Sequence, residues 1–147
     1  MKITTFISSI ISSILALACL SLPLAQAASP AEEGAELYII SPANGALLQN
    51  PITIRFGLKG MGVAPAGIEK TNTGHHHLLI DLEELPALDA PVPADEQHRH
   101  FGAGQTETTL ELSPGKHTLQ LLLGDHHHIP HNPPVVSEKI TIHVNGD

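Results

Sequence analysis

The stretch from Gly74 to Asp81 reads Gly-His-His-His-Leu-Leu-Ile-Asp, and it constrains the fold more than any other segment. Side chains in a β-strand alternate between the two faces of the sheet. One face then carries a histidine with two apolar side chains (His76, Leu78 and Ile80), and the other carries two histidines and a carboxylate (His75, His77 and Asp81). A shift of one residue would exchange the two sets, so the pattern predicts a strand with a fixed register and one face in a core.

Four more stretches alternate in the same way, and none outside the first 27 residues shows a helical period. They are Ile52–Leu58, Thr106–Leu112, His117–Leu123 and Val135–Val144. Segments rich in glycine, proline and serine separate them. We therefore predict an all-β fold, an immunoglobulin-like antiparallel β-sandwich of about seven strands. The stretch Leu112–His117 is similar to the corner at which such domains place a tyrosine, which gives His117 a structural interpretation as strong as a functional one.

The first 27 residues have the form of a secretory signal peptide. An uncharged apolar and hydroxyl-rich stretch, residues 3–24, is followed by Ala-Gln-Ala at residues 25–27, which fits the Ala-x-Ala cleavage pattern. Cleavage before Ala28 would remove Cys19, the single cysteine, and leave no thiol and no disulfide. A retained membrane anchor and lipidation of Cys19 are the alternatives.

The signal peptide implies a periplasmic or secreted protein with no membrane span after cleavage. We expect residues 28–35 to form a flexible tail and residues 36–147 to form a histidine-rich β-sandwich domain.

Charge narrows the class of partner. The chain carries a formal net charge of −8, with 15 acidic residues against 7 lysines and arginines, and it has 11 histidines. An acidic surface repels nucleic acid and anionic lipid and attracts cations. The excess of histidine over lysine and arginine directs attention to metal ions.

Three separate segments supply histidines in pairs that can reach one ion. Neutral imidazole suits zinc and copper(II), which need three or four nitrogens at about 2.0–2.1 Å. The candidate ligands are His75, His77, His98, His100, His128 and His131, with Asp125 as an oxygen ligand or a support for one. The exported chain has no thiol and keeps one methionine, Met61, which disfavours copper(I). Protons compete for imidazoles of ordinary pKa near 6.5, so affinity should fall between about pH 7 and pH 5.

Other interpretations compete with this one. His76 shares a face with two core residues and is expected to be a core histidine, and His143 lies on the exposed side of the last strand. A non-catalytic module that binds an envelope protein is the alternative function. We find no catalytic motif, and no prosthetic group other than the metal is indicated.

The chain resembles a family of exported bacterial domains of unknown function, family 4399. The resemblance runs from residue 38 to the end, and six motifs carry it: residues 55–58 with 60–67, residues 74–81, residues 98–102 with 104–108, residues 115–121, residues 124–125, and His128, Pro130, His131 and Pro133. It implies export and no particular chemistry. The family pattern leaves positions 126 and 127 free, which favours His128 and His131 over His126 and His127 as ligands.

Overall fold

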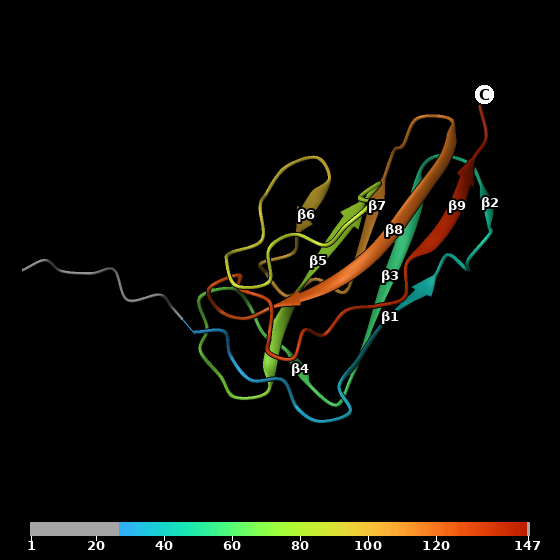
Figure 1. The fold of residues 1–147 in the computed structure, drawn as a ribbon. Helices are drawn as coiled ribbons and strands as arrows, with labels where there is room; N and C mark the ends of the chain where they lie inside the picture. Colours follow the sequence, from blue (N-terminus) through green and yellow to red (C-terminus); the bar gives the residue numbers. More distant parts are fainter. Residues whose placement is uncertain (1–26, 147) are drawn as a thin grey trace, which may run out of the picture.

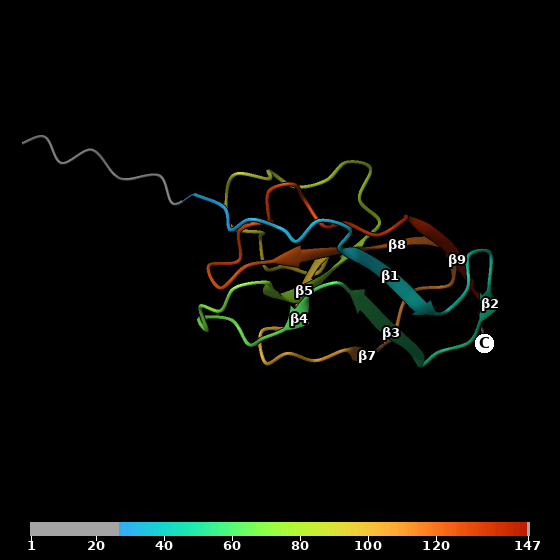
Figure 2. The same ribbon diagram turned by 90° about the horizontal axis from the view of Figure 1, so that it is seen from below.

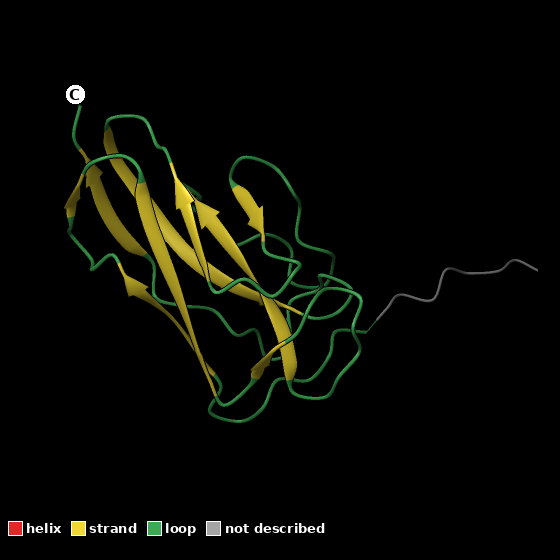
Figure 3. Cartoon of the chain, turned by 180° about the vertical axis from the view of Figure 1, so that it is seen from behind, coloured by secondary structure: helices red, strands yellow, loops and turns green. Residues whose placement is uncertain are grey.

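The computed structural model describes residues 27–146. These residues form two β-sheets and no helix (Figure 1; Figure 3). The predicted signal peptide, except for its last residue, lies outside the described part of the chain. The strands are β1 (Glu36–Ser41), β2 (Leu47–Leu48), β3 (Ile52–Lys59), β4 (Gly62–Val63), β5 (Thr73–Ile80), β6 (His98–His100), β7 (Glu107–Leu110), β8 (Gly115–Gly124) and β9 (Ile140–Val144). The all-β prediction is confirmed. No helix in residues 27–146 is long and apolar enough to cross a membrane.

The strands form two sheets, and Figure 2 shows them from below. The smaller sheet has the order β1-β3-β7, and the larger has the order β2-β9-β8-β5-β4, with β6 also paired to β5. Nine strands thus replace the predicted seven. Two of them, β2 and β4, pair in parallel with β9 and β5, so the sandwich is not purely antiparallel. These two strands have two residues each, which is too short for alternation to reveal them. The immunoglobulin-like assignment stays a prediction.

The main core lies between the sheets, and alternation explains which side chains reach it. Leu78 and Ile80 of β5 enter this core, as predicted from the register. The ring of Phe56 lies 4.9 Å from that of Phe101 and 5.2 Å from that of His76, measured between centroids. His76 is therefore a core histidine, as expected.

The opposite face of β5 is covered as well. Leu79, Leu122 of β8 and Val92 form a second apolar cluster, to which the partly buried Leu82, Leu85 and Val136 add. Val92 belongs to the proline-rich segment between β5 and β6. His75 and His77 lie on the same face of β5 as Leu79, and they are 0% and 1% exposed.

Candidate metal centre

Strand β5 supplies the floor of a histidine cluster. His75 and His77 are two residues apart on the same face, and their ring centroids are separated by 4.8 Å. Both rings are buried, and neither the Nδ1 of His75 nor either nitrogen of His77 has a hydrogen-bond partner. Buried polar atoms without partners cost free energy and mark places that need an explanation.

Two further imidazoles complete the cluster from other segments. Antiparallel pairing places His100 of β6 directly opposite His77. The loop after β8 brings His128, whose ring centroid lies 5.0 Å from that of His75 and 4.7 Å from that of His100. One potential donor atom from each of the four histidines lies within 4.8 Å of every other. Nitrogens that share one zinc or copper ion are at most about 4.2 Å apart, so small ring rotations would bring all four onto one ion.

The backbone of His128 is held in an unusual conformation. Its φ is 67°, in the left-handed region that residues other than glycine rarely adopt. Two hydrogen bonds fix it: the amide of His128 donates to the carbonyl of Asp125, and its carbonyl accepts from the amide of Val92 at 2.9 Å. The same segment that covers β5 thus also holds the loop ligand. Strain of this kind is typical of functional positions.

The carboxylate of Asp125, which is 1% exposed, stabilises this loop through hydrogen bonds. Its Oδ1 accepts from the amides of His127 and Ile129, at 2.9 and 3.1 Å. Its Oδ2 accepts from the amide and hydroxyl of Ser29, at 3.1 and 2.8 Å. Residues 29–31 also pair with Asn132. The segment predicted as a flexible tail is therefore joined to the loop that carries His128.

The electrostatics of the cluster favour neutral imidazoles. Burial, reinforced by the neighbouring histidines, lowers the pKa of His75 to about 4 and that of His77 to about 3. Burial and then His128 also lower the pKa of His100. Burial alone would raise the pKa of Asp125, but its hydrogen bonds lower it overall, so this carboxylate is ionised and acts on His75. Unprotonated nitrogens beside a buried negative charge are suited to a cation.

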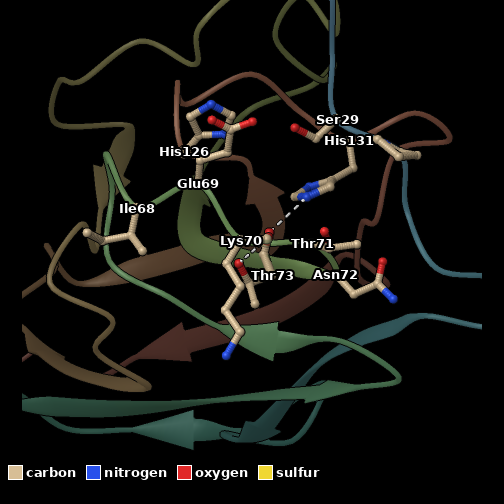
Figure 4. Close-up of a pocket in the computed structure, with 10 residues that line it drawn as sticks. Ser29, Ile68, Glu69, Lys70, Thr71, Asn72, Thr73, His126 and His131 are labelled. Carbon is tan, nitrogen blue, oxygen red and sulfur yellow. Dashed lines mark hydrogen bonds between the residues drawn. The ribbon is translucent and has the colours of Figure 1, made fainter.

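The other predicted ligands make different contacts and do not belong to the cluster of four. Nδ1 of His98 donates to Asp95 at 2.8 Å, closing the turn before β6. His131 is buried, with Nε2 3.1 Å from the carbonyl of Thr73 and Nδ1 3.4 Å from that of Leu123. Figure 4 shows its ring at the hollow beside Ser29 and Thr73. Asp125 is fully engaged as described above and supports the loop.

Another histidine with polar partners, His117, lies near the start of β8. Nδ1 of His117 donates to Asp81 at 2.7 Å, and its Nε2 lies 2.8 Å from the carbonyl of Ser113 and 3.4 Å from the Ser113 hydroxyl. The order resembles a serine–histidine–aspartate triad. However, both ring nitrogens face acceptors, an arrangement that favours a ring carrying two protons over one that serves as a base towards the serine. It ties the corner, which is the structural one of the two roles that the sequence left open.

Fold and site together define a two-sheet β domain with a four-histidine cluster, of which His75 and His77 are buried and His100 is exposed. The chain belongs to the family described as "Domain of unknown function (DUF4399)", whose model matches residues 54–145, more than half of the sequence and including all four histidines. The resemblance predicted from the motifs is thus confirmed. No curated protein and no solved structure matches this chain.

Proposed function

We propose that this protein binds one divalent transition metal ion, zinc or copper(II), through His75, His77, His100 and His128. The observation that carries the proposal is the convergence of four imidazoles from β5, β6 and the β8–β9 loop, with donor atoms within 4.8 Å of one another. Two of the four are buried, and an ion bound by one nitrogen of His77 would give a partner to an atom that otherwise has none. Packing and hydrogen bonds hold the ligands in place before binding, which favours affinity.

The donor set narrows the metal. Four neutral imidazoles suit zinc and copper(II), whereas copper(I) is favoured by thiolate or thioether ligands, of which the cluster has none. The nearest supporting carboxylate, Asp125, is occupied by its own four hydrogen bonds. When bound, the metal would supply a Lewis-acidic centre held by nitrogen ligands.

The cellular setting belongs to the same proposal. We infer a leader cleaved before Ala28 and a periplasmic or secreted location, because residues 1–27 have the form of a signal peptide. We infer an immunoglobulin-like exported domain from the alternating strands. We assign the protein a non-catalytic metal-binding role, since no nucleophile or acid–base pair accompanies the cluster among the described residues.

Titration calorimetry with zinc and copper(II) tests the proposal on the exported chain, purified without a histidine tag. We expect one ion per chain. His100→Ala should weaken binding by about 100-fold or more, because loss of a mere supporting partner already costs about 10–100-fold. His100 is exposed, so this change leaves the fold intact. The matched control is His143→Ala, an exposed strand histidine outside the cluster, which should bind as the unaltered chain does.

Two outcomes would overturn the proposal. The first is an unaltered chain that binds no ion, which would favour the alternative of a metal-free module that binds an envelope protein. The second is equal affinity in His100→Ala and His143→Ala, which would place any metal elsewhere.

A further inference from the structure

Two imidazoles of the cluster lie directly against glycines. A Cβ atom built on Gly124 would be 2.6 Å from Cε1 and 3.0 Å from Nδ1 of His77. A Cβ built on Gly102 would be 2.2 Å from Cε1 and 2.6 Å from Nε2 of His100. Both sets of distances fall well inside normal contact between non-bonded atoms, which is about 3.5–4.0 Å for carbon.

The strand register explains why Gly124 meets the cluster. Gly124 of β8 pairs with His75, and Leu122 pairs with His77, so all four lie on one face of the larger sheet. A side chain at position 124 would project into the space that the ring of His77 occupies. The absence of a side chain leaves room for this ring beside the strand.

The backbone does not explain these glycines. Neither Gly102 nor Gly124 has the positive φ that favours glycine, whereas Gly104, two residues beyond Gly102, has φ of 83°. The contacts that a Cβ would make with the two imidazoles therefore account for a glycine at these positions. Both glycines lie within two residues of a cluster ligand or its support: Gly102 follows His100, and Gly124 precedes Asp125.

We propose that Gly124 and Gly102 are positioning residues of the metal centre, which leave the space that His77 and His100 need to reach a shared ion. This inference rests on the proposed function. An alanine at either position would displace the adjacent ring by roughly 1 Å, given normal contact distances. Metal–nitrogen distances tolerate about 0.2 Å, so a ring moved that far leaves the ligand set.

The experiment compares Gly102→Ala and Gly124→Ala with the control Gly62→Ala, in the exported chain titrated with zinc and copper(II). Gly62 lies in β4 without positive φ, and a Cβ there meets only ordinary contacts, the nearest being Cγ2 of Thr73 at 3.4 Å. We expect each of the first two variants to lose about tenfold or more in affinity, as changes around metal ligands do. Gly62→Ala should lose little. Gly102 lies in a turn, which keeps the test valid if Gly124→Ala fails to fold.

A double-mutant cycle separates positioning from a general effect on structure. If Gly102 acts through His100, then Gly102→Ala should change neither the affinity nor the copper(II) absorption spectrum further in a His100→Ala background. An equal loss in both backgrounds would overturn the inference, and so would unaltered affinity in Gly102→Ala. An unaltered chain that binds no metal contradicts the proposed function instead. In that event NMR of the metal-free protein still tests the contact, because Gly102→Ala must shift the imidazole signals of His100, and unshifted signals would overturn it.

Discussion

The Nε2 atom of His75 and the Nδ1 atom of His128 lie 3.2 Å apart, although 53 positions separate the two residues in the sequence. Two nitrogens bound at about 2.0–2.1 Å to one ion lie about 2.9 Å apart at right angles and about 3.4 Å apart in a tetrahedron. The observed separation falls between these values. The strand ligand and the loop ligand are thus already spaced as a shared ion requires. Without an ion, a hydrogen bond joins the two nitrogens.

The first prediction concerns the pH dependence of metal affinity. The structure predicts a smaller loss of affinity at low pH than four imidazoles of ordinary pKa would show. With four ligand histidines of pKa near 6.5, protonation of each would lower the metal affinity about tenfold at about pH 5.5, or about 10⁴-fold in total. The pKa of His75 is about 4 and that of His77 about 3, so these two lose almost nothing there. Between about pH 7.5 and 5.5, affinity should therefore fall at least about 100-fold less than for ordinary imidazoles.

Titration calorimetry in buffers that do not bind metal measures this at both pH values. A fall of the full size expected for four ordinary imidazoles would mean that His75 and His77 are solvated, contrary to their burial.

The second prediction concerns His76, which is buried in the main core with no hydrogen-bond partner on either nitrogen. Burial lowers its pKa to about 4, from an ordinary value of 6.5, although the approach of the Gln105 backbone acts in the opposite direction. The unfolded chain therefore takes up this proton first. Its contribution to stability is fully present above about pH 6.5 and is lost as the pH falls towards 4, at a cost on the order of 3 kcal/mol.

His76→Phe removes this loss and the unpartnered nitrogens, and the new ring packs against Phe56. We expect the metal-free variant to be about 1–2 kcal/mol more stable at neutral pH and to gain further at about pH 4.5. Urea unfolding at the two pH values measures both gains. An acid dependence identical to that of the unaltered chain would show that His76 does not contribute to it.

The third prediction concerns the corner, where the sign of the pH effect reverses. Burial by itself would lower the pKa of His117, but the hydrogen bond to Asp81 and the contact with the Ser113 carbonyl raise it overall. The stabilisation is therefore fully present below the ordinary value of 6.5 and is lost as the pH rises through the raised pKa. The stability difference between the unaltered chain and His117→Gln should shrink from about pH 6 to about pH 9. Urea unfolding that gives a constant difference would contradict this.

The sequence predicted the part of the site that strand alternation and local pairing determine. His75 and His77 share a face because a strand has a period of two, and Leu78 and Ile80 on the other face fix the register. The convergence of His100 and His128 on them was a hypothesis from residue type alone. Their actual approach depends on β6 pairing with β5 and on a turn closed by Asp125. Sequence periodicity carries no information on either contact.

The sequence could not show which neighbouring histidines have structural partners. His98 and His131 have the same residue type and spacing as the cluster members, yet one hydrogen bonds to Asp95 and the other lies against two backbone carbonyls. The cover over this face of β5 was not predicted either, because Val92 packs on Leu79 and Leu122 from a segment between two prolines, where no strand pattern exists. Its length and apolar residues were the available signal.

The last prediction concerns Asp125, the buried carboxylate that links Ser29 to the loop of His128. In Asp125→Asn the negative charge is lost, and an amide N–H₂ must replace one of two oxygens that each accept two hydrogen bonds. We expect a stability loss of about 2–3 kcal/mol, typical of hydrogen bonds to a buried charged group. Metal affinity should fall by about tenfold or more, because the support of a ligand and the charge that favours a cation are both weakened.

Ser29→Ala is the matched comparison. It removes only the hydroxyl donor and keeps the amide bond and the charge, so its effects on stability and on affinity should both be smaller than those of Asp125→Asn. Urea unfolding and titration calorimetry on the two variants measure the pair of quantities. Asp125→Asn could also reduce stability and leave metal affinity unchanged. That result would show that Asp125 supports the fold but does not position His128 for metal binding.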